Sequence, residues 1–325
     1  MISQQDGLIT AMLLDGSGSG KPLTWVEIRG WTPDRGVLWV HLDYTSDQVR
    51  RWLLEESEID PLVAEALLAE ETRPRCVAVA EGLFLSLRGV NNNPGADPED
   101  MVAIRLFCTE QRVISTRRRR LLSISDLLES LKQGEGPRNS GELIAMLAHR
   151  LSERMSGVIT ELEERIDTLE EKIIEGVGQE VRSGILELRR EIIKLRRYLA
   201  PQREALNRLT VEQTAWLNEH DRLQLREASD KISRYVEDLD SARDRAAVAY
   251  EELSSRQAEQ LNSRMYLLSL VAGLFLPLGF LTGLLGVNVG GIPLADDPWG
   301  FVEVLVFLLI LVLVQVVVFR RKHWF

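Results

Sequence analysis

The sequence predicts an α+β membrane protein, with a cytoplasmic α/β domain and a long helical stalk continuous with the first of two C-terminal transmembrane helices. Three observations predict this fold class. Short runs of β-forming residues recur up to residue 116, and heptad-like apolar spacing follows from Gly141 onward. Two almost wholly apolar stretches lie near the end of the sequence. The predicted domains are the cytoplasmic α/β domain (1–140), the helical funnel or stalk (141–264) and the two-helix transmembrane domain (265–325).

The α/β domain is predicted from six short strands separated by turn-rich or helical segments. Helices are expected over 46–56 and 61–71, and NNNPGADPED (91–100) is expected to be a loop between two strands. The run of arginines after residue 116 ends the last strand. The predicted strands are LITAMLL (8–14), VLWVHL (37–42), CVAVA (76–80), LFLSLRGV (83–90), MVAIRLFC (101–108) and RVIST (112–116).

Several classes of function are disfavoured by the same region. The stretch GSGSGKP (16–22) is not a phosphate-binding loop, because Asp15 and Pro22 stand where that motif needs Gly and Ser or Thr, so we interpret it as a flexible turn. Cys76 and Cys108 are too few for a disulfide framework and are expected as buried strand residues. The sequence shows no nucleophile motif and no clustered metal ligands, which argues against an enzyme.

Three long helices are predicted after the α/β domain. The segment 141–176 is amphipathic, 185–199 is a second helix, and Pro201 is expected to break the chain before a third. Neither Gly nor Pro occurs between Pro201 and Gly273. A continuous helix from about residue 206 to residue 286 would be about 120 Å long at 1.5 Å per residue.

Two membrane helices are predicted over 265–286 and 299–319, since the first holds no charged residue and the second only Glu303. Basic residues flank the cytoplasmic ends of both, and the joining loop carries only acidic ones, so both termini are expected in the cytoplasm. The start of the chain lacks a signal peptide pattern. Two spans cannot enclose a water-filled path, so transport would require several copies around an axis.

The loop GVNVGGIP (286–293) joins the two spans. Gly286 lets backbones of symmetric copies approach closely, and Val287 and Asn288 follow at the outer mouth. Repeated by symmetry, Asn288 forms a ring of carbonyl oxygens, which suits a divalent cation that keeps most of its water. Two alternatives stay open: Asn288 only caps the helix end, or the hairpin anchors a coiled-coil scaffold that transports nothing.

At this point the sequence resembles the CorA metal ion transporters, whose signature is Gly-Met-Asn after a Pro-containing first membrane helix. The similarity is carried by FLPLGFLTGLLGVN (275–288), VGGIP and the terminal RRKHWF, with Val287 in place of the Met. This Gly-Val-Asn variant is similar to the ZntB-like zinc transporter branch. Further segments that carry this resemblance are RPRC (73–76), LRGVN (87–91), DMVAIR (100–105) and ISTRRR (114–119).

The resemblance implies a homopentamer in the bacterial inner membrane, with the first span lining a pore and the second facing lipid. It implies zinc transport, with proton-coupled uptake and export both open, and a magnesium or cobalt channel of the CorA type as the alternative. No cofactor is expected besides the transported Zn²⁺. The expected partners are other copies of the chain, the lipid bilayer and divalent metal ions, and not nucleic acid.

The face of the first span that lines the axis follows from helical spacing counted back from Asn288, and the resemblance supports the same face. Met265 and Leu268 would form apolar rings that close the path by excluding water, with ordinary packing or lipid contact as the alternative. Glu251 and Asn288 are the candidate metal-contacting residues. The predicted pore-lining residues are Glu251, Ser254, Ala258, Leu261, Met265, Leu268, Ala272, Leu276, Gly279, Thr282 and Gly283.

The residue types on this face are not the ligands that zinc prefers. Zinc prefers His and Cys ligands, yet residues 265–288 contain neither, nor any carboxylate, so tight dehydrated binding inside the membrane is not expected. The four histidines are widely separated and are expected to be packing or surface residues: His41, His149, His220 and His323.

Overall fold

The computed structural model describes residues 6–70, 72–79, 82–175, 179–287 and 298–322. It divides into two compact units, Met1–Tyr250 and Glu251–Phe325, which are considered separately. The first unit holds a seven-stranded sheet and several helices, and the second holds two apolar helical segments. The predicted α+β fold class is therefore confirmed, while the three-part division at residues 140 and 264 stays a prediction.

The sheet has the strand order β2-β1-β3-β7-β6-β5-β4, and only β3 and β7 run parallel. All six predicted strands are present, with bounds shifted by at most one residue over the described part of the chain. Ala80, the last residue of the predicted third strand, lies outside the described residues. The strands are β1 (Leu8–Leu14), β2 (Gly20–Pro22), β3 (Val37–Asp43), β4 (Arg75–Val79), β5 (Gly82–Gly89), β6 (Val102–Cys108) and β7 (Arg112–Arg117).

Strand β2 was not predicted, because GSGSGKP was interpreted entirely as a turn. The turn itself is confined to its first residues, where the Asp15 carboxylate accepts hydrogen bonds from the backbone N–H groups of Ser17 (2.8 Å) and Ser19 (3.1 Å). The chain then returns along β1, with Met12 opposite Pro22. Pro22 is tolerated there because β2 is an edge strand, where a missing N–H breaks no inner ladder.

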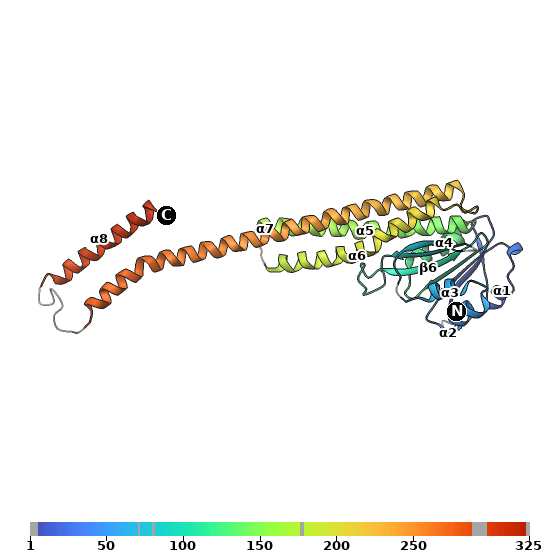
Figure 1. Ribbon diagram of the computed structural model, residues 1–325, viewed down its shortest axis with the longest axis horizontal. Coiled ribbons are helices and arrows are strands. Elements are labelled where there is room, and N and C mark those ends of the chain that lie inside the picture. Colours follow the sequence, from blue (N-terminus) through green and yellow to red (C-terminus); the bar gives the residue numbers. More distant parts are fainter. Residues whose placement is uncertain (1–5, 71, 80–81, 176–178, 288–297, 323–325) are drawn as a thin grey trace. The chain divides into compact units, whose positions relative to one another are not determined.

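Helices cover both faces of the sheet (Figure 1). Phe84, Phe107 and Ile114 are paired across β5, β6 and β7 and lie in the buried cluster formed with the first helices. Leu151 of α5 lies on the opposite face, where it approaches Gly89. These helices are α1 (Trp25–Arg29), η1 (Pro33–Arg35), α2 (Asp47–Arg51), the π-helix η2 (Trp52–Glu56), α3 (Pro61–Leu68), α4 (Leu122–Gln133) and α5 (Ser140–Glu175).

Some predictions on this domain are confirmed and others are wrong. Helix 46–56 is confirmed as α2 and η2, and Cys76 and Cys108 are buried free cysteines in strands, as expected. The predicted helix 61–71 ends earlier, at Leu68, where Ala69 takes an extended backbone conformation, and residue 71 lies outside the described residues. Helices α1 and α4 were not predicted.

Pro201 does not break the chain, contrary to our prediction. It lies inside α6 (Gln179–Val211), which packs against β4 and β5. Leu199 and Gln202 are buried on either side of it, and the Gln202 side-chain oxygen accepts a hydrogen bond from the Arg88 backbone N–H at 2.6 Å. Tertiary packing of the flanking residues thus outweighs the loss of one helical hydrogen bond at the proline.

The third long helix, α7, runs from Glu219 to Leu285 rather than from about residue 206. Its start is fixed by a reciprocal cap: the Asp221 N–H donates to Asn218 Oδ1 (2.9 Å), and the Asn218 N–H donates to Asp221 Oδ2 (3.2 Å). Arg222 donates hydrogen bonds to the backbone carbonyls of Thr210, in the last turn of α6, and of Thr214 and Leu217, between the two helices. The chain therefore turns at residues 212–218 and continues as one helix afterwards.

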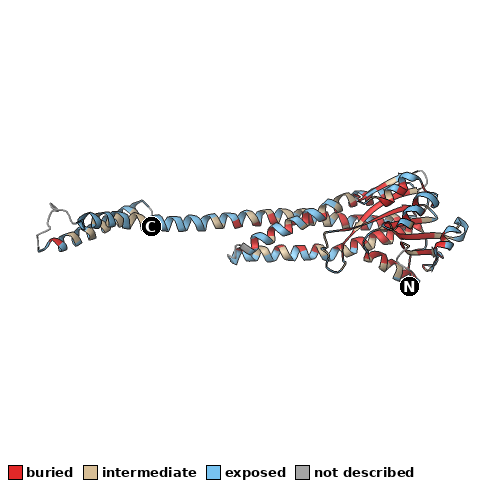
Figure 2. Ribbon diagram, turned by 90° about the horizontal axis from the view of Figure 1, so that it is seen from below, coloured by how far each residue is buried: buried red, intermediate tan, exposed pale blue. Residues whose placement is uncertain are grey.

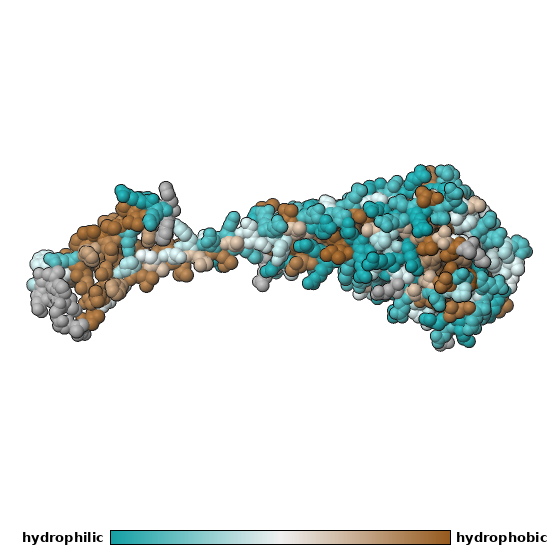
Figure 3. Space-filling model, in the orientation of Figure 1, coloured by the Kyte–Doolittle hydropathy of each residue, from teal (hydrophilic) through white to brown (hydrophobic). Residues whose placement is uncertain are grey.

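The second unit contains the end of α7 and helix α8 (Gly300–Arg321). Among the described residues, α7 and α8 are the two helices long and apolar enough to cross a membrane. Figure 3 shows the apolar residues gathered over α8 and the last part of α7. Both predicted spans are thus helical, the first ending at Leu285 and the second beginning at Gly300.

Candidate functional site

The predicted pore-lining residues share one face of α7. At 100° per residue, ten of them fall in a stripe about 100° wide, and Thr282 lies just beyond its edge. In the single chain this stripe is exposed except at Ala272, which is half-buried. Large apolar side chains on it are more than half exposed: Leu261 60%, Met265 67%, Leu268 70% and Leu276 71%. Figure 2 shows the same exposure along the last part of α7.

Helix α8 packs on the other side of α7. A Cβ built on Gly273 would lie 3.2 Å from the Phe319 ring, so the two helices approach closely there. The half-buried residues of each helix recur every three or four positions, as expected for two facing stripes. On α7 they include Leu270, Leu274, Leu278 and Leu281, and on α8 Val304, Leu308, Leu311, Gln315 and Phe319. The stripe predicted to line a pore therefore points away from α8.

Three glycines lie in or directly after the C-terminal half of this stripe. A Cβ on Gly279 or Gly283 would meet no atom within 4 Å, so both positions are open to a neighbouring surface. Gly286 follows the last turn of α7, and its N–H donates to the Thr282 carbonyl at 2.9 Å. Val287 is exposed beyond it. Asn288, the predicted ring residue, lies outside the described residues.

Thr282 is held by the helix itself. Its hydroxyl lies 3.0 Å from the Leu278 carbonyl oxygen and 3.2 Å from that of Gly279, and can donate to either. These contacts lie one turn after Pro277, which cannot donate a backbone hydrogen bond. The hydroxyl proton is thereby directed to the backbone, and only the oxygen lone pairs remain for a ligand.

The polar end of the stripe lies at Glu251 and Ser254, which are both exposed. The neighbouring Glu252 forms an ion pair with Arg256 at 2.6 Å, one turn along the helix. Within the described residues, no group of three or more His, Cys, Asp or Glu side chains could hold a metal ion in the single chain.

The histidines lie where the sequence analysis expected, as far as the structure describes them. His41 is fully buried in β3, His149 lies 3.2 Å from the Glu153 carboxylate on one helix, and His220 is exposed. His323 falls outside the described residues.

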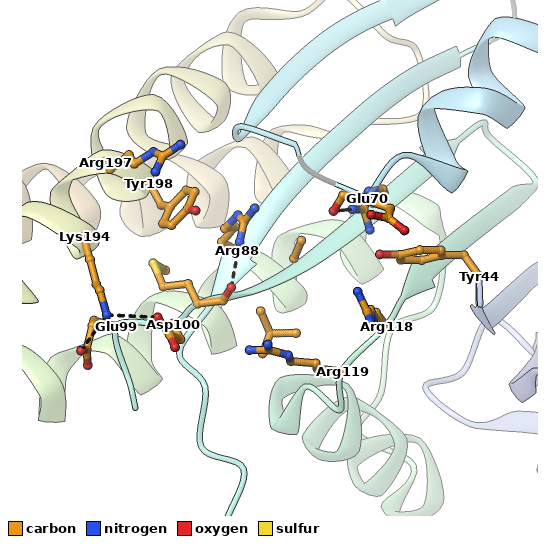
Figure 4. Close-up of a pocket in the computed structure, with 14 residues that line it drawn as sticks. Tyr44, Glu70, Arg88, Glu99, Asp100, Arg118, Arg119, Lys194, Arg197 and Tyr198 are labelled. Atoms are coloured by element: carbon orange, nitrogen blue, oxygen red, sulfur yellow. Dashed lines mark hydrogen bonds and ion pairs between the residues drawn. The ribbon is translucent and has the colours of Figure 1, made fainter. Parts of the chain in front are cut away.

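One further site was missed by the sequence analysis. A pocket of about 450 Å³ opens in the first unit, lined by arginines from β5, β6, α6 and the two residues that follow Arg117 at the end of β7 (Figure 4). Arg105 and Arg88 lie in the segments DMVAIR and LRGVN, which carry the family resemblance, and no binding role was predicted for either. The alternation of side chains along each strand predicts which face each arginine occupies. That the two arginines lie close together can be predicted only when the pairing register of the strands is known.

Comparisons with known proteins bear on the whole chain. The family described as "CorA-like Mg2+ transporter protein" matches residues 34–321. The chain is 37% identical over 323 residues to the zinc transport protein ZntB of Pectobacterium atrosepticum, covering 99% of this chain and 97% of that relative. It is 38% identical over 322 residues to the divalent cation transporter CmaX of Pseudomonas aeruginosa, covering 98% and 97%.

Two solved structures also match the chain over its full length. The structure of the full-length CmaX protein matches with a TM-score of 0.88 at 38% identity, and covers 100% of both chains. The CorA magnesium transporter from Methanocaldococcus jannaschii matches with a TM-score of 0.81 over 100% of both chains. At 19% identity the second match speaks for the fold alone.

Proposed function

The chain belongs to the family of CorA-like Mg²⁺ transporter proteins, and from that premise we propose that it carries divalent metal cations, above all zinc, across the bacterial cytoplasmic membrane. The choice of zinc is supported by full-length similarity to relatives named as zinc and divalent cation transporters. These relatives are named as transport proteins and not as enzymes.

The path for the ion is formed by several copies of the chain around one axis, as a homopentamer. The observation that carries this proposal is the uncovered stripe on α7, opposite the face packed on α8. In a membrane span an apolar stripe faces either lipid or another helix, and small residues on it favour packing against a neighbouring helix. The open faces of Gly279 and Gly283 allow neighbouring helices to approach closely at its outer half.

Each part of the stripe has a distinct role in this proposal. Asn288 rings the outer mouth beyond Gly286 and Val287, Met265 and Leu268 form a gate that closes by excluding water, and Glu251 attracts cations at the inner end. The absence of His, Cys and carboxylates from residues 265–288 favours passage of a hydrated ion over tight binding. Basic residues after α8 support cytoplasmic termini.

Zinc flux into liposomes tests the proposal directly. Purified full-length protein in liposomes loaded with a zinc-sensitive dye is expected to pass zinc faster than protein-free liposomes. A membrane-anchored scaffold would pass none, and a channel of the magnesium type would pass Mg²⁺ well but Zn²⁺ poorly. Flux equal to that of empty liposomes for both ions, in protein shown to be oligomeric, would contradict transport.

The gate predicts a mutational effect. Leu268→Asn is expected to raise basal zinc flux severalfold, because an amide ring hydrates a constriction that leucine keeps dry. Leu267→Asn is the matched control, since Leu267 is also exposed but lies about 100° around the helix, away from the stripe. Flux of Leu268→Asn equal to wild type, with both variants assembled normally by size-exclusion chromatography, would place the gate elsewhere.

A further inference from the structure

The pocket in the first unit lies between the sheet and α6, remote in sequence from the α7 stripe (Figure 4). Cationic side chains outnumber acidic ones among its lining residues by six to three, in a chain whose formal net charge is -10. The cationic residues are Arg88, Arg105, Arg118, Arg119, Lys194 and Arg197, and the acidic residues are Glu70, Glu99 and Asp100. A local positive excess in an acidic chain indicates a site for anions.

The strand register places two of these arginines, Arg88 and Arg105, on one face of the sheet. Arg105 on β6 is paired with Ser86 on β5 and with Thr116 on β7. Arg88 lies two residues beyond Ser86 in β5, and side chains two apart in a strand share a face. Arg118 follows directly after β7, which ends at Arg117. The backbone pairing therefore places Arg88 and Arg105 on the same face of the sheet, and Arg118 lines the same pocket from the segment after β7 (Figure 4).

Arg105 is the deepest of them and only 1% exposed. It donates one hydrogen bond to the Glu70 backbone carbonyl at 2.8 Å and lies over the Tyr44 ring at 4.8 Å, but its buried Nε atom has no hydrogen-bond partner. No carboxylate in the described part of the chain forms an ion pair with it. Burial lowers the pKa of Arg105, Tyr44 opposes this shift through its charge and a side-chain hydrogen bond, and repulsion from Arg88 adds to the lowering.

A buried guanidinium without a carboxylate is unusual, because removing a charge from water costs several kcal/mol unless a counter-charge compensates. An anion bound in the pocket would supply that compensation. The observation thus points to a ligand and not only to a polar surface.

The remaining lining groups define the shape of the ligand. Arg88 donates hydrogen bonds to the Thr72 and Met101 carbonyls, and its guanidinium carbon lies 4.0 Å from the centre of the Tyr198 ring. Because Arg88 already stacks on this ring, less of the ring surface remains for stacking a flat base. Lys194 is engaged by Glu99 and Asp100, at 3.3 Å each. The charge left for a ligand comes mainly from arginines, whose planar forks match the oxygens of phosphate.

We propose that this pocket binds a phosphate group of a compact multivalent anion, with Arg105 at its floor and Arg118 and Arg119 at its rim. Its volume of about 450 Å³ accommodates a diphosphate or triphosphate chain. The same chemistry could come from a soluble polyphosphate or from a lipid headgroup. The inference does not depend on the proposed transport function, because binding is measured without any flux.

Isothermal titration of the full-length protein in detergent, with divalent ions chelated, tests the proposal. The probes are sodium pyrophosphate, the soluble lipid dihexanoyl phosphatidic acid, and sodium chloride at matched ionic strength. Saturable binding of either phosphate probe but not of chloride is expected. Tighter binding of pyrophosphate assigns the site to a soluble anion, and tighter binding of the lipid assigns it to a headgroup.

Variants identify the pocket as the place of binding. Arg118→Gln and Arg119→Gln are expected to weaken binding of the better probe about tenfold each, since each removes one charge-assisted hydrogen bond. Arg50→Gln is the matched control, because Arg50 is exposed on α2 and does not line the pocket. No saturable heat with either phosphate probe, or equal weakening by Arg50→Gln and Arg118→Gln, would overturn the proposal.

Discussion

Replacing Asn288 with alanine is expected to abolish zinc flux while the oligomer assembles normally. In a symmetric assembly the substitution removes every amide oxygen of the proposed ring at once, so a hydrated cation loses all its acceptors at the outer mouth. Both membrane helices and the first unit keep their sequences. Flux is measured with a fluorescent zinc reporter in proteoliposomes, after size-exclusion chromatography has shown equal assembly of wild type and variant.

Asn288→Gly separates the ring from a helix cap. If Asn288 only ended the helix, alanine would cost about 1 kcal/mol of local stability and glycine would be nearly neutral, because glycine suits a helix C-terminus well. If the amide contacts the ion, glycine fails as completely as alanine. Near-normal zinc flux in Asn288→Gly would therefore rule out the ring, whatever the alanine variant does.

Acid is expected to destabilise the first unit through His41. This side chain is fully buried, and burial together with the nearby Arg117 charge lowers its pKa from 6.5 to about 3. Its Nδ1 lies 2.8 Å from Ser115 Oγ, and its Nε2 has no partner, so the neutral ring fits where a charged one does not. Below pH 6.5 the unfolded chain binds a proton that the folded chain excludes, and stability falls toward pH 3.

The expected loss between pH 7.5 and pH 5 is about 2 kcal/mol from this one group. It is followed as the midpoint of thermal unfolding, by tryptophan fluorescence of the full-length protein in detergent. His41→Gln cannot titrate and is expected to show a shallower decline over the same range, even if its midpoint is lower at neutral pH. An identical slope in wild type and His41→Gln would contradict the assignment.

Local pattern explains which parts of the fold were predictable. Runs such as LITAMLL and MVAIRLFC form β1 and β6 with almost the expected bounds, because apolar β-forming residues flanked by turns have few other stable solutions. Strand β2 was not predicted, because the three residues GKP form a strand only by pairing with β1. The helix break predicted at Pro201 was wrong for a similar reason, because the local sequence does not show that Gln202 and Leu199 are buried.

Some of the features that were not predicted could have been predicted from the sequence, and others could not. The start of α7 could have been found from Asn218 and Asp221, which are spaced as a capping box. The α7 stripe was available from helical spacing, while its exposure opposite α8 required coordinates. The arginine pocket depends on the register between Arg105 and Ser86, and such long-range pairing is not encoded in any single segment.

The parallel contact between β3 and β7 has a consequence for how this domain folds. Strands β2, β1 and β3 pair with near neighbours in sequence, and so do β4 to β7, which gives two local antiparallel sets. The sets are joined only when Leu38 meets Arg112 and the rest of the two strands align. Closing that long loop carries an entropy cost before any contact offsets it, so we expect docking of the two sets to be the slow step of folding. Until then, the meeting edges of both sets stay open to pairing with other nascent chains.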